Sequence, residues 1–429
     1  KKHLAASNLE AIMLGYNHVI ENFAYPLPLS VKPLNKTKNH VIIDGNTAAG
    51  LACVYAGATV GAWYPITPST SLMDSFQAFC NQLRKCEKTK KNNFCIIQAE
   101  DELAAIGMVL GASWNGARAF TPTSGPGISL MSEFIGFAYY SELPAVIFDI
   151  QRAGPSTGMP TRTQQCDLMI CAYASHGDTR HPLLFPSNPE ECFYMTLSAF
   201  DLADELQTPI FVMSDLDIGM NDWMCPDLQW DNNYQPKRGK VLNAEQLDAM
   251  EKFYRYLDVD GDGITYRTLP GEHAKGSFFT RGSGHNKFGG YTEDSQEYQD
   301  VIDRLLVKWE TARKMMPEAV IDYSKFNKTA IISYGSSDGA SREALYRLKE
   351  QNKNYNYCCI KSFPFCKSVK DFINKHEKIF IVEQNRDAQM RSLLMLDLEI
   401  DPKKLISILH YNGNPIYANF IIEEVLKNE

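Results

Sequence analysis

The sequence lacks several patterns that would each point to a class of site. Its 11 cysteines include no C-x-x-C pair, which excludes a zinc ribbon or a ferredoxin-type cluster built from local spacing. The phosphate-binding patterns G-x-x-x-x-G-K-[S/T] and G-x-G-x-x-G are absent, so ATP hydrolysis and ordinary dinucleotide binding have no support. No H-E-x-x-H or Ser-His-Asp arrangement is discernible. We therefore expect no metal ligands in this chain.

Charge and hydropathy argue against two further classes of partner. With 43 basic and 51 acidic residues the formal net charge is −8, which argues against a nucleic-acid surface and a polybasic membrane patch. No apolar run reaches the roughly 18–20 residues that cross a bilayer. The odd number of cysteines, scattered among apolar neighbours, is typical of buried thiols in a reducing compartment, and we expect a cytoplasmic protein.

Strand and helix patterns alternate from residue 40 onward. Short apolar runs bounded by turn residues predict strands, and apolar residues at helical spacing predict helices between them. The predicted strands include 41–43, 60–64, 96–97, 117–123, 145–151 and 209–215, and the predicted helices include 103–116, 128–143 and 166–174. A second block of the same kind begins near residue 329. Alternation at this spacing predicts an α/β fold with a mainly parallel, doubly wound sheet.

Residues 96–134 form the stretch around which we expect the site to be built. Glu100, Asp101 and Glu102 follow the end of a predicted strand, and Ser124-Gly125-Pro126-Gly127 breaks the chain one strand-and-helix unit later. An acid at a strand-to-helix turn, with a Gly-rich turn nearby, is the layout of a ligand crevice in an open α/β sheet. The alternative is that the three acids only complement the dipole of the helix that follows.

Two further segments carry candidate ligand groups. Tyr64-Pro65-Ile66-Thr67-Pro68-Ser69 follows a predicted strand; it can be a rigid loop and helix cap, or it can present Thr67 to a ligand. Arg152 follows the strand AVIFDIQ and precedes a loop rich in Gly, Pro, Ser and Thr. Because ligands collect beyond the carboxyl ends of parallel strands, Arg152 is predicted to reach the same crevice as Glu102. Its alternative role is a structural ion pair.

Residues 220–318 are polar, rich in aromatic residues and poor in strand patterns. Asp258-x-Asp260-x-Asp262-Gly263 begins like an EF-hand calcium loop, but Leu269 stands where that loop needs its closing glutamate. We interpret it as a tight acidic turn, with a cation site as the alternative.

Three parts are expected along the chain: residues 1–39, the tail of an upstream segment and a linker; residues 40–318, with a polar insertion at about 220–300; and residues 326–429.

Several long motifs in the same order resemble the α subunits of 2-oxoacid:ferredoxin oxidoreductases, above all the 2-oxoglutarate branch. They are YPITPS at residues 64–69, EDELAAIGMVLGASWNGARAFTPTSGPG at 100–127, RAGPSTG at 152–158 and VEQN at 382–385. The resemblance runs from about residue 40 to the C-terminus. It implies a pyrimidine-type thiamine diphosphate-binding domain, followed by a smaller transketolase-C-terminal-like α/β domain at residues 326–429.

The resemblance also implies roles for individual residues. The family's glutamate falls on Glu102, its substrate threonine on Thr67 and its substrate arginine on Arg152, and these three would serve catalysis. The residues that would surround the cofactor are Glu102, Tyr64, Pro65, Ile66, Thr67, Ser124 and Gly125. The residues that would surround the substrate are Thr67, Arg152, Thr157, Thr161 and Arg162. A carboxyl group on the pyrimidine ring nitrogen would drive the tautomerisation that activates thiamine diphosphate.

The implied enzyme decarboxylates a 2-oxoacid, above all 2-oxoglutarate, with coenzyme A to acyl-CoA and CO2, passing electrons to ferredoxin, or runs the reverse carboxylation. A β subunit would hold the diphosphate, magnesium and a 4Fe-4S cluster, in a dimer of heterodimers. The alternatives are a pyruvate or branched-chain 2-oxoacid oxidoreductase, a non-redox thiamine diphosphate enzyme and a non-catalytic partner subunit. Arg162, with His285 and Arg281 behind it, is the nearest candidate to bind the distal carboxylate of 2-oxoglutarate; alternatively the β chain does so.

Overall fold

The computed structural model describes residues 2–24, 29–323 and 327–429. The chain divides into two compact units, residues 1–40 and residues 41–429. The first unit contains the helix α1 (Lys2–Asn22). Exposed apolar side chains recur every three or four residues along it, at Leu9, Ile12, Tyr16 and Val19. The interpretation of residues 1–39 as the tail of an upstream segment stays a prediction.

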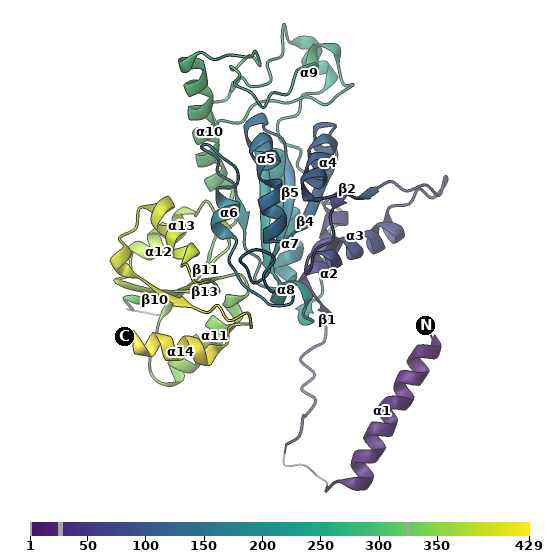
Figure 1. The fold of residues 1–429 in the computed structure, drawn as a ribbon, viewed down its shortest axis with the longest axis vertical. Helices are drawn as coiled ribbons and strands as arrows, with labels where there is room; N and C mark the ends of the chain where they lie inside the picture. Colours follow the sequence, from purple (N-terminus) through teal and green to yellow (C-terminus); the bar gives the residue numbers. More distant parts are fainter. Residues whose placement is uncertain (1, 25–28, 324–326) are drawn as a thin grey trace. The chain divides into compact units, whose positions relative to one another are not determined.

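The second unit is built on a seven-stranded sheet (Figure 1). Its strands, in spatial order, are β12 (Ser362–Phe363), β6 (Leu183–Leu184), β7 (Pro209–Asp215), β5 (Ala145–Gln151), β4 (Arg118–Thr123), β2 (Ala58–Trp63) and β3 (Cys95–Gln98). All neighbouring strands are parallel except β12 and β6, which pair antiparallel. This confirms the predicted α/β class. Every side chain of β5 and β7 is buried, as expected for parallel strands covered on both faces.

Helices cover both faces of this sheet because alternate strand residues point to opposite sides. Val146 and Phe148 of β5 pack into the cluster that includes α2 (Gly45–Tyr55), α3 (Thr70–Leu83) and α7 (Pro189–Leu206). Ala145 and Ile147 pack into the cluster that includes α4 (Glu102–Trp114), α5 (Gly125–Ser141) and α6 (Leu168–Ala172). Strand 41–43 was expected among these units. It lies in β1 (His40–Ile43) and pairs instead with β8 (Trp223–Pro226) in a separate two-stranded sheet.

A second, five-stranded sheet follows in the C-terminal part. Its order is β14 (Leu405–Leu409), β13 (Lys378–Glu383), β10 (Thr329–Tyr334), β11 (Asn356–Ile360) and β9 (Val320–Asp322), and only β9 is antiparallel to its neighbour. The helices of this part are α11 (Ser337–Glu350), α12 (Lys367–Asn374), α13 (Gln389–Leu398) and α14 (Ala418–Lys427), and a 3-10 turn, η2, spans Pro402–Lys404. The predicted second α/β block is therefore confirmed.

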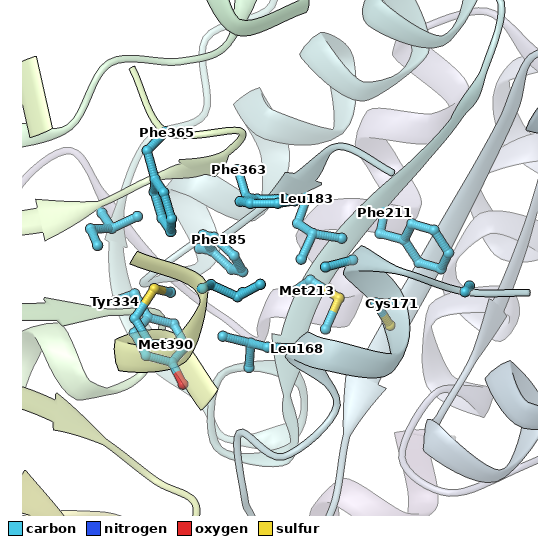
Figure 2. Packing of buried hydrophobic residues seen from close by; sticks show 14 of the residues in the cluster. Leu168, Cys171, Leu183, Phe185, Phe211, Met213, Tyr334, Phe363, Phe365 and Met390 are labelled. Carbon is cyan, nitrogen blue, oxygen red and sulfur yellow. The ribbon is translucent and has the colours of Figure 1, made fainter. Parts of the chain in front are cut away.

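One continuous apolar core joins the two sheets. Leu183 and Phe211 of the seven-stranded sheet and Tyr334 of the five-stranded sheet belong to the same buried cluster (Figure 2). Phe363 lies in β12, which the C-terminal part contributes to the edge of the larger sheet. The sequence pattern did not indicate that a strand of the C-terminal part joins the larger sheet, because β12 has only two residues and its partner β6 is distant in the sequence.

The polar insertion contains little regular structure, as its composition predicts. Its elements are α8 (Leu216–Met220), β8, α9 (Ala244–Ala249), the 3-10 turn η1 (Ala274–Gly276) and the long helix α10 (Ser295–Met315). Buried charges hold it to the sheet. The fully buried Glu142, at the end of α5, binds Arg304 at 2.6 Å and Lys308 at 2.9 Å, and Arg255 donates to its carbonyl oxygen at 2.8 Å.

The acidic turn of the insertion is neutralised by a lysine. The Lys240 ammonium lies 2.6 Å from Asp260 and 2.8 Å from Asp262. Asp258 accepts hydrogen bonds from the backbone N–H groups of Asp260, Gly261 and Gly263. Within the described ranges, no group of three or more His, Cys, Asp or Glu side chains could hold a metal ion. The structure therefore supports the interpretation as a tight turn, because the ammonium occupies the position between the carboxylates.

We expect Glu142→Gln to lower the free energy of unfolding by about 3 kcal/mol, because it leaves the buried cations without their counter-charge. Urea unfolding at neutral pH measures this loss. Burial opposes ionisation of Glu142, but Arg304 and Lys308 hold its pKa well below the usual range. The carboxylate therefore stabilises the fold above a pH of about 4.3, and the difference between wild type and variant shrinks as pH falls through the folded-state pKa.

The matched control is Glu310→Gln, which removes the ion pair between Glu310 and Arg313. The Glu310 side chain is 60% exposed. Such a pair contributes about 1 kcal/mol or less. Equal losses in the two variants would show that the buried network does not hold the insertion in place.

Candidate active site

The predicted site residues lie at one edge of the seven-stranded sheet. Parallel pairing sets Thr123 of β4 beside Asp149 of β5, and Gln151 of β5 beside Asp215 of β7. The carboxyl ends of these strands therefore meet at the same edge, where ligands bind in open α/β sheets. The turns that follow β2, β4 and β5 carry Thr67, Ser124 and Arg152.

Arg152 and Thr67 are brought together, as predicted. The Arg152 guanidinium is 7% exposed; its Nη1 donates to the Thr67 carbonyl at 2.7 Å and its Nη2 donates to the Thr157 carbonyl at 2.8 Å. The Thr67 side chain is exposed. No carboxylate of a described residue lies within ion-pair distance of Arg152, and its Nε has no acceptor there. The Arg152 side chain is therefore held by two backbone carbonyls and not by an ion pair, and its Nε–H donor remains available.

The loop that carries Thr67 is held in place by hydrogen bonds to its backbone carbonyls. Ser69 donates from its N–H and its hydroxyl to the Ile66 carbonyl, both at 2.9 Å, and Asn46 donates to the Pro68 carbonyl at 2.9 Å. Ser69 precedes α3, but its hydroxyl does not cap the helix. The helix-cap alternative is thus not realised by Ser69. Tyr64 is exposed beside Thr67.

The three acids of the focal stretch have different surroundings. Glu100 is exposed, and Asp101 caps α4 by accepting from the Ala104 N–H at 2.7 Å. Glu102 is 5% exposed, and its carboxyl group has no hydrogen bond or ion pair to any described residue. The dipole alternative therefore fits Asp101, while Glu102 is a mostly buried acid whose carboxyl group is free to accept from a bound donor.

The amino end of α5 packs directly against Glu102. A Cβ atom built on Gly127 would lie 2.8 Å from Glu102 Cγ and 2.0 Å from Thr123 Oγ1, so only glycine allows this approach. Ser124, at the N-cap of α5, has a buried hydroxyl that finds no partner in the described part of the chain. Ser124 and Glu102 are the kind of unpartnered polar groups that can hold a cofactor ring.

A cleft of about 690 Å³ opens beside Arg152. Its walls come from the start of α5, the loop after β5, the start of α6 and the loop after β13; its lining includes Gly125, Ser129, Arg152, Thr157, Met159, Gln164, Cys166, Asp167, Asn385, Arg386, Asp387, Gln389 and Tyr411. Asp167 was not predicted, because only tertiary packing brings it beside Gly125, where a Cβ atom would lie 2.8 Å from each of its carboxylate oxygens.

Buried amides join the two walls of the cleft. The Gln165 N–H donates to the Gln384 carbonyl at 2.8 Å, and Asn385 Nδ2 donates to the Gln165 carbonyl at 3.0 Å. Gln384 Nε2 donates to Ser336 Oγ at 2.7 Å. The VEQN motif thus connects the five-stranded sheet to the loop that carries the site. Because buried amides are fully hydrogen-bonded here, the walls are held at a defined separation.

Of the residues predicted to bind the substrate's distal carboxylate, Arg162 flanks this cleft. Its carbonyl accepts from the Ala153 N–H at 2.9 Å and its N–H donates to the Met159 carbonyl at 3.1 Å, and both of those residues line the cleft. Arg162 is exposed, donates to the neighbouring Thr161 carbonyl at 3.2 Å and packs near Gly413. His285 is buried against Tyr140, close to the carboxyl end of α5. The 17 residues of α5 place that end about 25 Å from Gly125. His285 and Arg281, the two lower-ranked candidates, therefore lie near the far end of α5. The Arg281 carbonyl accepts from the Ser141 hydroxyl there.

Comparisons with known proteins agree with this geometry. A family model described as pyruvate flavodoxin/ferredoxin oxidoreductase, thiamine diphosphate-binding, matches residues 51–247. The chain is 34% identical over 408 residues to 2-oxoacid:ferredoxin oxidoreductase 1, subunit alpha, of Sulfurisphaera tokodaii, covering 93% of this chain and 63% of that protein. It is 33% identical over 350 residues to the 2-oxoglutarate synthase subunit KorA of Methanocaldococcus jannaschii, covering 80% of this chain and 88% of the relative.

A solved structure gives the same answer. The 2-oxoglutarate:ferredoxin oxidoreductase from Magnetococcus marinus, determined with 2-oxoglutarate, coenzyme A and succinyl-CoA bound, matches 98% of this chain and 71% of that chain with a TM-score of 0.88 and 27% identity. The fold is thus that of a thiamine diphosphate-binding subunit. The chain belongs to the family of 2-oxoacid:ferredoxin oxidoreductase α subunits, which confirms the resemblance seen in its motifs. It spans less than two thirds of the Sulfurisphaera relative.

We expect Gly127→Ala to lower the thermal unfolding temperature and to weaken cofactor binding, because the new methyl group must displace Thr123 or Glu102. Overpacking of this kind costs about 1–3 kcal/mol. Differential scanning calorimetry of the chain with its partner subunit measures the stability. The control is Gly111→Ala in α4, where a Cβ atom meets nothing within 4 Å. That variant should gain about 0.5–1 kcal/mol, and a loss in both variants would contradict the argument.

Proposed function

We propose that this chain is the α subunit of an enzyme that oxidatively decarboxylates a 2-oxoacid with coenzyme A to acyl-CoA and CO2, passing electrons to ferredoxin, or that runs the reverse carboxylation. The observation that supports it most is Glu102, a buried carboxyl group without a partner at the edge of the sheet. Arg152 and Thr67 lie at the same edge and offer groups for an anionic substrate. Family membership adds independent support.

The residues present fit the ring of thiamine diphosphate. Glu102 would hydrogen-bond to the pyrimidine ring, with Ser124 and Gly125 on one side and the segment Tyr64–Thr67 on the other. When bound, the cofactor supplies the carbon nucleophile and the electron sink that decarboxylation of a 2-oxoacid needs. Glu102 would hold and move the proton that activates it, which is the role of a positioned general acid and base. Magnesium and a 4Fe-4S cluster would lie on the β subunit. For the cluster, the lack of a C-x-x-C pair in this sequence supports that assignment.

Arg152 would hold the carboxylate of the substrate. Its guanidinium is oriented by the carbonyls of Thr67 and Thr157, and its Nε is still a donor. Charge-assisted hydrogen bonds from arginine are well suited to a carboxylate. The exposed Thr67 hydroxyl would approach the 2-oxo group. Thr157 and Thr161 would line the same side of the site.

We favour 2-oxoglutarate as the substrate because a KorA subunit and an oxidoreductase that binds 2-oxoglutarate are similar over most of this chain. Pyruvate or a branched-chain 2-oxoacid is the alternative within the same reaction. A non-redox thiamine diphosphate enzyme would copurify without iron, and for a non-catalytic subunit the activity of the complex would not change on loss of Glu102.

The proposed assembly is a dimer of heterodimers with the β subunit, in the cytoplasm, with ferredoxin as the electron partner. None of the described helices is long and apolar enough to span a membrane.

We expect Glu102→Gln, in the complex with the β subunit, to keep the fold and lose about 10²–10⁴-fold in turnover. Glutamine preserves the hydrogen bond but cannot exchange the proton. The measurement is 2-oxoglutarate-dependent reduction of ferredoxin in the presence of coenzyme A. Glu100→Gln, at an exposed acid two residues away, is the matched control and should retain activity. Near-wild-type turnover of Glu102→Gln would refute the proposed function.

We propose Arg162 as a candidate for the residue that distinguishes 2-oxoglutarate from substrates without a second carboxylate. If so, Arg162→Ala lowers kcat/KM for 2-oxoglutarate by about 10²-fold and leaves 2-oxobutyrate nearly unchanged, because a distal carboxylate loses its charged partner. Arg391→Ala, which removes a guanidinium bound to the Leu405 carbonyl, controls for a general loss of charge. If the two substrates fall together, or if neither falls, the β subunit binds the distal carboxylate instead.

A further inference from the structure

Asp149 and Asp167 form a pair of acids behind Arg152 to which no role has been given. Asp149 lies in β5, fully buried, three residues before Arg152. Asp167 directly precedes α6 and lines the cleft beside Arg152. The two carboxyl groups are close enough to share a hydrogen bond, although neither carboxylate can donate one. A hydrogen bond between two carboxyl groups requires a proton on one of them.

The remaining contacts of the pair fix where that proton lies. Asp149 Oδ2 accepts from the Cys171 thiol at 3.6 Å, and Asp167 Oδ1 accepts from the Cys166 thiol at 3.6 Å. Asp149 Oδ1 and Asp167 Oδ2 are buried and receive no donor from the described residues. One shared proton satisfies both oxygens at once. Without it, two buried carboxylates would repel each other and remain unsolvated.

The charged groups around the pair are few. Among the described residues, the only cation that faces it is Arg152, at the end of β5, whose charge lowers the pKa of Asp167 without a direct ion pair. From α5 the neighbour is the uncharged Gly125, and from α13 it is the amide of Gln389, which donates to the Cys166 carbonyl. Arg386 and Asp387 line the same cleft but pair with each other at 2.7 Å.

Burial decides how many protons the pair holds. Burial raises the pKa of Asp167 to about 6, although the Cys166 hydrogen bond and the Arg152 charge act in the opposite direction. Burial and the charge of Asp167 together raise the pKa of Asp149 well above its usual range. At neutral pH the pair therefore holds one proton, on Asp149, and one negative charge, on Asp167.

We propose that Asp149 and Asp167 are positioning residues for Arg152 that couple binding of the substrate carboxylate to proton uptake by Asp167. The proposal rests on the proposed function, in which Arg152 receives that carboxylate. In the free site, the negative charge of Asp167 compensates the buried guanidinium. When a carboxylate arrives at Arg152, Asp167 becomes a like charge beside it, and a proton taken from solvent through the cleft removes the repulsion. Asp149 keeps its proton throughout.

The linkage has a definite sign. Because the bound carboxylate raises the pKa of Asp167 further, affinity for the substrate is lowest above the pKa of the bound form, increases as pH falls from that pKa to the pKa of free Asp167, and levels off below it. Between about pH 8 and about pH 5.5 we expect a five- to tenfold gain in affinity, roughly the coupling typical of two interacting sites. A substrate carboxylate itself stays ionised over this range.

The test is isothermal titration of the complex with glutarate, a dicarboxylate that lacks the reacting keto group, in two buffers of different ionisation enthalpy. A difference between the two observed enthalpies counts the protons taken up. Asp167→Asn should abolish the proton uptake and bind at about pH 8 roughly five- to tenfold more tightly than wild type. Asp149→Asn keeps a donor toward Asp167 and should retain uptake, whereas Asp149→Ala removes that donor and should move the pH dependence to higher pH.

Asp387→Asn is the matched control, because Asp387 lines the same cleft but pairs with Arg386. It should leave the proton uptake unchanged. Uptake that persists in Asp167→Asn, or that is absent in wild type, overturns the proposal. Infrared difference spectra separate this outcome from a failure of the proposed function. The band of a protonated carboxyl group that Asp149→Asn removes reports the shared proton whether or not the complex oxidises a 2-oxoacid, and its absence in wild type also overturns the proposal.

Discussion

The parallel pairing of β2, β4, β5 and β7 is the constraint on which the site depends. Parallel strands end at the same edge of a sheet, so the turn after each strand delivers its polar residues to one crevice. A one-residue slip of β4 against β5 would turn every side chain of the slipped strand to the other face and separate Thr123 from Asp149. The buried apolar side chains on both faces oppose such a slip, since they fit two different helix layers. Packing of the core therefore sets the geometry of the chemistry.

The site gathers polar groups that the fold leaves desolvated but not fully paired. Glu102 and Ser124 have no hydrogen-bond partner, and Arg152 has two carbonyl acceptors and a spare donor. Each such group costs free energy in the folded chain unless a ligand satisfies it. The same groups need little reorganisation when a cofactor ring or a carboxylate arrives, which is the advantage of a preorganised site. Stability at this edge of the sheet is thus lower than it could be, and the apolar core elsewhere compensates for it.

Away from the candidate site, charged side chains form ion pairs within the chain. Glu142 holds Arg304 and Lys308, and Lys240 lies between Asp260 and Asp262. The first set of pairs joins the end of α5 to α10, and the second lies within the polar insertion. The contrast with Glu102 is informative because both glutamates are buried. One has two cations within hydrogen-bonding distance and is structural, whereas the other has none among the described residues and lies at the ligand-binding edge.

The sequence by itself determined the α/β class, the strands that end at the crevice, and Glu102, Thr67 and Arg152 as the residues to examine, because strand periodicity and turn composition are local properties. It could not distinguish Glu102 from Glu100 and Asp101 by pattern; the resemblance did that, and burial gave the physical reason. Only the tertiary structure brought Asp167 to Gly125, removed His285 from the cleft and placed β12 in the larger sheet. These contacts join residues far apart in the chain, and their free energy comes from packing that no local pattern records.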